Sequence, residues 1–195
     1  MKRVLLGVLG SVVLTLPVLA ALKQGDNAPD FSARASLAGS EFDFSLKDAL
    51  KKGPVVVYFY PSAFTGGCNI QARTFAVNKD KFDAARATII GVSRDSIARL
   101  NAFSADPEYC GGKVAVASDP AGKISDSYGL TKTNPRAGMK DSRGADIDHD
   151  FTERVTFIVT PDNRIAATFS SAADKITPAQ HVEKALEAVQ QLSAK

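Results

Sequence analysis

The 195-residue sequence predicts an α/β fold built on a central mixed sheet with flanking helices. Two observations carry this prediction. Strand-like apolar runs alternate with helical segments through the middle of the chain, which implies parallel strands joined by helical crossovers. Near the carboxyl end, two strand-like runs are separated by the short turn Pro161-Asp162-Asn163, which implies an antiparallel hairpin.

Each element follows from a local pattern. Residues 31–36 and 40–45 flank a turn at 37–39 and predict a small amino-terminal β-hairpin. Residues 54–60 are a continuous β-branched and aromatic run, which is typical of a central strand buried on both faces. The elements expected next are a helix at 67–79, a strand at 87–93, a helix at 96–105, a strand at 114–117 and a helix at 122–128.

The last elements are hairpin strands at 155–160 and 165–169, followed by a closing helix that begins at Thr177-Pro178. Proline is favoured at the first helical position, and the apolar residues of this helix share one face. We expect His181 on its exposed surface. The complete order is the layout of a thioredoxin-like fold, with the amino-terminal hairpin as an extension.

The first twenty residues have the composition of a secretory signal peptide. Lys2 and Arg3 form a basic start, a mostly apolar run follows, and Ala20 and Ala21 are the small residues that a signal peptidase needs. An uncleaved membrane anchor is the alternative, but the run is short and contains a proline. We therefore expect cleavage after residue 20, export to the bacterial periplasm, and a single mature domain spanning 21–195.

The composition excludes several partners. Removing Lys2 and Arg3 lowers the formal net charge from +3 to +1, so the mature domain is close to neutral. It has no basic run interleaved with aromatic residues, and nucleic acid is therefore not an expected partner. No second membrane-length apolar segment follows, so no membrane association is expected after cleavage. Two cysteines in an exported chain would by default form one structural disulfide.

Cys68 stands between the strand at 54–60 and the helix at 67–79. The carboxyl end of a central strand is where α/β folds place ligands. The first turn of a helix presents unpaired N–H groups that stabilise an anion, and the thiolate is the reactive form of cysteine. Gly66 and Gly67 let the backbone approach a ligand closely. This position favours a reactive thiol over a structural one.

Two motifs resemble those of a known family. Pro61, Thr65 and Cys68 match the active-site pattern Pro-x-x-x-Thr-x-x-Cys of the peroxiredoxins, the AhpC/TSA family. Farther on, Arg154-Val-Thr-Phe is similar to the strand that supplies the active-site arginine of that family. The run Cys68-Asn-Ile-Gln71-Ala resembles the peroxiredoxin Q, or bacterioferritin-comigratory, branch. The resemblance covers nearly the whole predicted domain.

The resemblance implies a thiol peroxidase that reduces hydrogen peroxide and organic hydroperoxides. Cys68 would attack one peroxide oxygen and become a sulfenic acid. Thr65 would hydrogen-bond the thiolate and the peroxide, Arg154 would stabilise their charge, and Pro61 would shield the sulfur. The N–H groups of Gly67 and Cys68 would complete the cradle. No metal, haem or flavin cofactor is implied.

Each of these residues also has an ordinary structural explanation. Thr65 could simply cap the helix, Arg154 could be a surface charge beside Glu153, and Pro61 could only end the strand. Their joint order and spacing favour the catalytic interpretation.

The resemblance also implies a resolving thiol, a second cysteine that condenses with the sulfenic acid to form a disulfide. The peroxiredoxin Q branch often carries it five residues after the peroxidatic cysteine or in the following helix, but these positions are Arg73 and Ser104. We expect the remaining thiol, Cys110, to form a disulfide with Cys68, for which the start of the helix would have to unwind. A structural role, an intermolecular disulfide and resolution by an outside thiol are the alternatives. The implied reductant is a thioredoxin-like protein or a small thiol, and the implied state is a monomer or homodimer.

Residues 131–153 form a long stretch rich in Gly, Asp, Arg and Lys, which indicates a functional or mobile loop. Its acidic run holds His149, but one histidine among acids without helical spacing is a weak metal signal, and a solvated loop is expected instead. Because His149 lies shortly before Arg154, the loop could border the mouth of the active site.

Two other classes of protein compete with a peroxidase. A thioredoxin-like thiol–disulfide oxidoreductase should carry Cys-x-x-Cys at the start of the helix. This chain has Cys68 there, but Gln71 stands in place of the second cysteine. A non-catalytic thioredoxin-fold binding module would hold a preformed Cys68–Cys110 disulfide and an inert thiol.

Overall fold

The computed structural model describes residues 20–194, so all but the last residue of the predicted signal peptide lies outside the described residues. The strands are β1 (Ser32–Leu37), β2 (Ser40–Ser45), β3 (Val55–Phe59), β4 (Thr88–Ser93), β5 (Ala115–Ser118), β6 (Lys132–Thr133), β7 (Phe151–Thr152), β8 (Val155–Val159) and β9 (Ile165–Ser170). The helices are α1 (Leu46–Leu50), α2 (Gly66–Ala84), α3 (Ile97–Ala105), α4 (Lys123–Ser127), α5 (Ser171–Asp174) and α6 (Pro178–Ser193).

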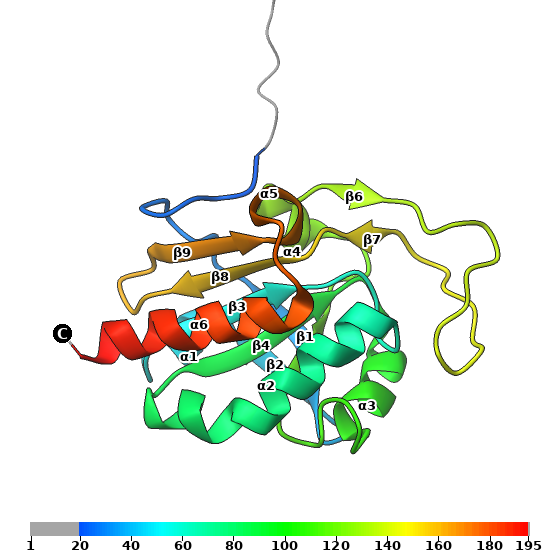
Figure 1. Cartoon of the computed structure of the whole chain (residues 1–195), viewed down its shortest axis with the longest axis horizontal. Helices are drawn as coiled ribbons and strands as arrows, with labels where there is room; N and C mark the ends of the chain where they lie inside the picture. Colours follow the sequence, from blue (N-terminus) through cyan, green and yellow to red (C-terminus); the bar gives the residue numbers. More distant parts are fainter. Residues whose placement is uncertain (1–19, 195) are drawn as a thin grey trace, which may run out of the picture.

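A seven-stranded mixed sheet forms the centre, in the order β2-β1-β5-β4-β3-β8-β9 (Figure 1). The strands β3, β4 and β5 are parallel, whereas β8 and β9 are antiparallel additions on the far side of β3. The predicted α/β class with a mixed sheet is therefore confirmed. The predicted amino-terminal hairpin is confirmed as well, but β1 also pairs with β5, so the hairpin widens the main sheet.

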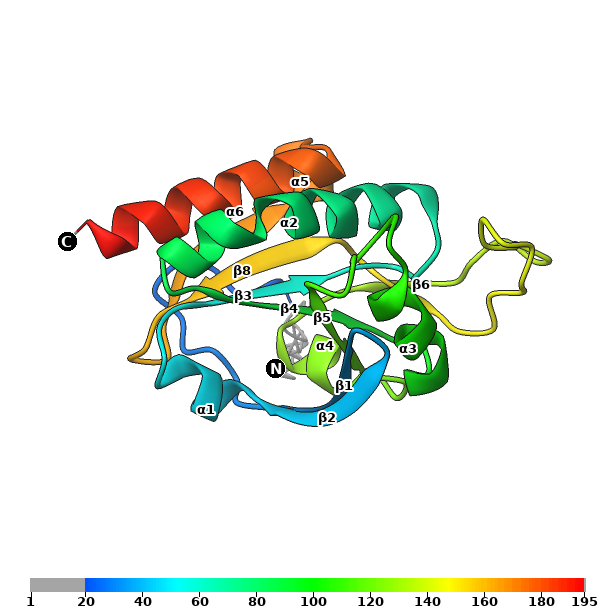
Figure 2. The same ribbon diagram turned by 90° about the horizontal axis from the view of Figure 1, so that it is seen from below.

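Helices cover both faces of the sheet: α2 and α6 pack on one, and α1 and α4 on the other (Figure 2). The strand β3 contributes to both cores. Val56 and Tyr58 belong to the core beneath α2 and α6, and Val57 and Phe59 belong to the core beneath α1 and α4. A strand buried on both faces has no polar side, which explains the unbroken apolar run in the sequence.

The helix that carries Cys68 is longer than the sequence pattern indicated. It begins at Gly66 and continues to Ala84, because Phe75 and Phe82 both bury against the sheet. The closing helix begins where predicted: Thr177 and Gln180 form a reciprocal capping box with Pro178 in the first turn. Within residues 20–194, no helix combines the length and apolar character needed to cross a membrane.

Candidate active site

Cys68 lies in the first turn of α2 and is only 2% exposed. Thr65 is the N-cap residue, with extended backbone, and the Asn69 N–H donates to its carbonyl oxygen at 2.8 Å. The N–H groups that precede Asn69 have no acceptor within the helix, because its first turn has no residues upstream. The sulfur therefore lies beside the positive end of a nineteen-residue helix, which stabilises negative charge.

Arg154 brings a cation to the same sulfur. Its Nη2 donates to Cys68 Sγ at 3.2 Å, and its Nη1 donates to Gln71 Oε1, one helical turn after the cysteine. The residue directly precedes β8, whose Val155 pairs with Phe59 at the end of β3. Because β3 ends and β8 begins at this edge of the sheet, Arg154 lies beside the turn that leads from β3 into α2.

Gly67 makes room for this contact. A Cβ atom there would lie 3.1 Å from Arg154 Nη2 and 3.2 Å from Pro178 Cγ, closer than ordinary van der Waals contact. Gly66, by contrast, has open space on the side where a Cβ would point. The missing side chain at position 67 thus lets the guanidinium reach Cys68, while the start of α6 closes the other side.

The structure gives the Thr65 hydroxyl a different partner from the one expected, and its role toward the peroxide stays a prediction. Its hydroxyl donates to the Ser62 carbonyl oxygen at 2.8 Å, not to Cys68, and its side chain does not cap the helix either. The single hydroxyl proton of Thr65 is therefore donated within the turn that precedes α2. Pro61 is half-buried at the start of that turn, and buried Phe64 adopts a left-handed backbone with φ of 60°. Such a conformation in a non-glycine residue is strained, as turns at functional sites often are.

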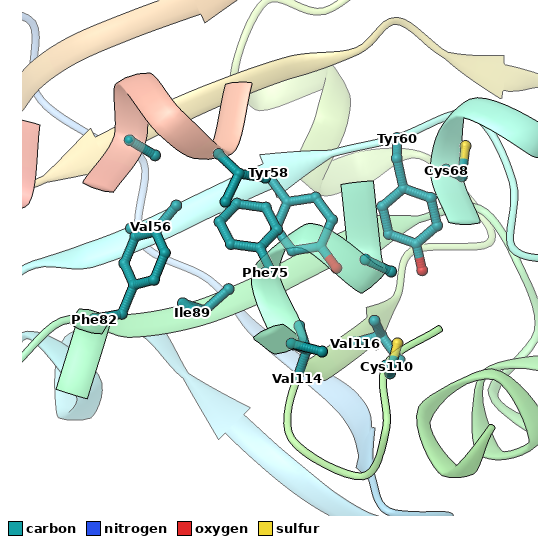
Figure 3. Close-up of a cluster of buried hydrophobic side chains, with 14 of the residues drawn as sticks. Val56, Tyr58, Tyr60, Cys68, Phe75, Phe82, Ile89, Cys110, Val114 and Val116 are labelled. Carbon is teal, nitrogen blue, oxygen red and sulfur yellow. The ribbon is translucent and has the colours of Figure 1, made fainter. Parts of the chain in front are cut away.

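Cys110 has a different environment. It is fully buried in the loop after α3, and burial together with nearby Asp106 raises the pKa of its thiol. Both cysteines are free and belong to one apolar cluster, with the Tyr60 ring drawn between them in Figure 3. The hydroxyl groups of Tyr58 and Tyr60 point toward the Cys110 side and have no hydrogen-bond partner there.

The prediction that His181 is exposed is wrong. Its ring is fully buried, with Nδ1 3.0 Å from Thr156 Oγ1 and Nε2 2.9 Å from Ser171 Oγ. Burial and the charge of Arg154 lower the pKa of His181 to about 4. The spacing of His181 from Val182, Ala185 and Val189, which are all buried, places it on the apolar face of α6 and could have shown this.

Asp95 and His149 are further residues that the sequence did not assign to the site. Asp95 is fully buried after β4, where its carboxylate accepts the Ala63 N–H at 2.7 Å and contacts His149 at 2.8 Å. A carboxylate at the end of a core strand beside β3 was the available signal for Asp95. Within residues 20–194, no group of His, Cys, Asp and Glu side chains is arranged to hold a metal ion.

Comparison with known proteins agrees with this geometry. The family model of the AhpC/TSA family matches residues 24–168. The putative peroxiredoxin Bcp of Helicobacter pylori is 29% identical over 168 residues, which cover 86% of this chain and 98% of that protein.

Two solved structures are similar to the whole fold. Peroxidoxin BcpB from Mycobacterium tuberculosis is 26% identical with a TM-score of 0.71, and the alignment covers 87% of this chain and 97% of that one. The bacterioferritin comigratory protein of Xanthomonas campestris, described for its alkyl peroxide reduction activity, is 25% identical with a TM-score of 0.63 and coverage of 82% and 91%. The chain therefore belongs to the AhpC/TSA family, on its peroxiredoxin Q and Bcp branch, and is a thiol peroxidase.

Proposed function

We propose that Cys68 is the cysteine that attacks the peroxide. The observation that carries this proposal is the Arg154 guanidinium at 3.2 Å from Cys68 Sγ, at the amino end of α2. The thiolate would attack one peroxide oxygen, so that an S–O bond forms and the O–O bond breaks. The sulfur is oxidised to a sulfenic acid, and the second oxygen leaves as hydroxide or alkoxide and takes up a proton. Arg154 and the N–H groups of Gly67 and Cys68 would stabilise the charge that develops on the oxygens.

Recovery of the thiol would use Cys110. The sulfenic acid would condense with the Cys110 thiol, forming an S–S bond and releasing water. Both thiols lie in one cluster, and Gly111 and Gly112 adopt left-handed φ values of 59° and 67° beside Cys110. Because Cys110 is fully buried, this step requires local opening of the loop and of the start of α2. A thioredoxin-like protein or a small thiol would then reduce the disulfide.

The proposed substrates are hydrogen peroxide and organic hydroperoxides. Support for the second class comes from the Xanthomonas campestris relative, which is described for alkyl peroxide reduction. The reaction needs only an accessible O–O bond and a stabilised leaving oxygen, so the rest of the substrate can vary.

Mass spectrometry of the reduced protein after one equivalent of hydrogen peroxide tests both halves of the cycle. Wild type should lose two hydrogens as the intramolecular disulfide forms, and Cys68→Ser should stay unchanged. Cys110→Ser should gain one oxygen or two. Oxidation of Cys68→Ser at the wild-type rate would overturn the role of Cys68. A wild-type protein that stops at the sulfenic or sulfinic acid would overturn only the role of Cys110. Oxidation of dithiols without turnover of peroxide would favour a thiol–disulfide oxidoreductase.

Export is a separate proposal that rests on the leader sequence. Leu22 is already tied to the domain, since its N–H donates to the Tyr128 carbonyl at 3.2 Å and its carbonyl accepts from Thr168 Oγ1 at 2.8 Å. Cleavage after Ala20 would therefore keep these contacts. When the full chain is expressed in a bacterium, the periplasm should contain a protein whose mass is that of a chain beginning at Ala21. A protein that keeps the leader contradicts cleavage.

A further inference from the structure

We propose that His149 and Asp95 form a pH-sensitive latch, which holds residues 131–153 against the turn between Pro61 and Phe64, and that Asp95 is a positioning residue for Cys68. The proposal rests on the assignment of Cys68 as the attacking thiol, and it adds a means of control that lies outside the contact between Cys68 and Arg154.

The carboxylate of Asp95 fixes the turn directly. One oxygen accepts the Ala63 N–H at 2.7 Å and the Ser93 hydroxyl at 2.7 Å, and the other accepts the Ser62 hydroxyl at 2.9 Å. Ser62 in turn accepts the Thr65 hydroxyl through its carbonyl. Asp95 is therefore connected through two hydrogen bonds to the N-cap of the helix that carries the cysteine.

His149 ties the long loop to this carboxylate. Its Nε2 lies 2.8 Å from Asp95 Oδ1, and its Nδ1 lies 2.9 Å from the carbonyl oxygen of Asp150. A carboxylate and a carbonyl only accept hydrogen bonds, so both ring nitrogens have to donate. Only the charged imidazolium carries a proton on each nitrogen. Charged His149 can therefore make both bonds at once. The neutral ring keeps only one of them, because an Nε2 without a proton can accept only the Ser62 hydroxyl, 3.3 Å away, and no longer donates to Asp95.

A second attachment lies next to the first. Arg99 of α3 contacts both Asp95 Oδ1, at 3.0 Å from its Nε, and Asp141 Oδ2 of the loop, at 2.8 Å from its Nη2. Beyond Asp141, the Ser142 N–H donates to the Phe64 carbonyl oxygen at 2.8 Å. The loop thus contacts Phe64, the residue with the strained backbone. In Figure 2 the loop lies at the end of the molecule where α2 begins.

The surrounding charges determine the direction of the pH dependence. His149 faces Asp95 from the end of β4 and Asp148 and Asp150 from its own loop, while Arg99 lies behind Asp95 and Lys132 lies 3.4 Å from Asp150. Burial opposes the charged ring, but the bonds to Asp95 and to the Asp150 carbonyl outweigh it and raise the pKa of His149.

Burial likewise opposes the charged carboxylate, but the bond from His149 keeps the pKa of Asp95 below its usual value. The raised pKa of the imidazole means that the latch is closed at mildly acidic pH. It opens as the pH rises through that raised value, and at the acidic end it is lost only when Asp95 takes up a proton.

Amide hydrogen exchange and peroxide kinetics of the full mature protein test the latch together. Protection is the observed exchange rate corrected at each pH for the intrinsic rate of an unprotected amide. In wild type, the protection of the Ser142 and Ala63 amides should fall as the pH is raised from 6 to 9. His149→Gln keeps one donor but cannot titrate, so its protection should not vary with pH. Asp146→Asn is the matched control, because it removes the exposed Lys140–Asp146 ion pair of the same loop and should behave like wild type.

The rate of Cys68 oxidation should follow the same pattern. We expect wild type to exceed His149→Ala by about tenfold at pH 6, and the ratio should approach one near pH 9 because deprotonation opens the wild-type latch. A ratio that does not vary with pH, or protection that His149→Gln leaves pH-dependent, overturns the latch. If Cys68→Ser instead reacts with peroxide like wild type while the protection still depends on pH, the assignment of Cys68 fails and the latch stands.

Discussion

The two cysteines of this protein are equally hidden from solvent but have opposite electrostatic surroundings. Cys68 lies at the start of a long helix, where Arg154 donates to its sulfur. Cys110 lies in a loop, packed in an apolar cluster beside Asp106, and its thiol pKa is raised. Burial alone would make both thiols inert. The difference indicates that, with Cys68 as the proposed attacking thiol, hydrogen-bond donors and not solvent exposure distinguish the two cysteines.

The largest expected effect comes from removing the donor that distinguishes Cys68. Arg154→Met should slow oxidation of Cys68 by about 10²- to 10³-fold, because the charge on the sulfur and on the leaving oxygen loses its strongest partner. Stopped-flow measurement of one turnover with hydrogen peroxide gives this rate. Arg154→Lys should recover only part of it, since lysine lacks the fork that binds sulfur and Gln71 together. A rate within threefold of wild type for Arg154→Met would contradict the comparison.

A smaller effect is expected when the same donor is displaced and not removed. The Cβ of Gly67→Ala would press on Arg154 Nη2 and Pro178, so Cys68 oxidation should fall by about tenfold. Gly66→Ala is the matched control, because nothing lies within 4 Å of its Cβ and alanine suits a helix better than glycine. The control should keep its rate within about twofold of wild type. Equal losses in both variants would show that backbone freedom, and not the position of the arginine, is what matters.

The last prediction concerns the stability of the structure behind Arg154 and not the rate of oxidation. In the folded protein the pKa of His181 is about 4, below its unfolded value, so the unfolded state binds the extra proton between these values. Stability that depends on neutral His181 is therefore present above about pH 6.5 and lost as the pH falls toward 4. It amounts to about 3 kcal/mol.

Urea unfolding at pH 7 and pH 4.5 measures this contribution. The stability of His181→Asn should fall less between the two pH values than that of wild type, whatever its starting stability. At the basic end, the stability of His149→Gln should fall less than that of wild type as the pH rises. The folded pKa of His149 is raised, so wild type loses the contribution of the charged ring there. The same acid sensitivity in wild type and His181→Asn would show that the buried ring is not the source.

Much of the fold and part of the site could be predicted from the sequence because they depend on local patterns. The apolar run of β3 and the capping box of α6 are visible in consecutive residues. The pattern Pro61, Thr65 and Cys68 likewise lies in one short continuous segment, from the end of β3 into the first turn of α2. His181 was misplaced because a polar residue on an apolar helix face is tolerated only with buried partners, and these come from β8 and the start of α5.

The latch was beyond sequence reasoning for a similar reason. Asp95 and His149 are separated in the sequence by α3, β5, α4, β6 and most of the long loop. The stretch Gly91-Val-Ser-Arg-Asp95 resembles one in the family, but it does not indicate His149 as the partner of Asp95. The contact arises only when the loop folds back on the end of β4. The direction of the Thr65 hydroxyl was also not predictable, because a competing acceptor, the Ser62 carbonyl, lies in the same turn.

The pairing of β3 with β8 has a consequence for how this chain can change in length. Val155 pairs with Phe59 through an unbroken antiparallel ladder, and the next residue outward is Arg154. Deleting one residue in either strand would turn the arginine to the opposite face of the sheet, away from α2. The irregular step at Ile158 and Val159 occurs only against β9, on the outer side. Insertions should therefore accumulate in the outer hairpin and in residues 131–153, while the inner pair of strands keeps its length in every working relative.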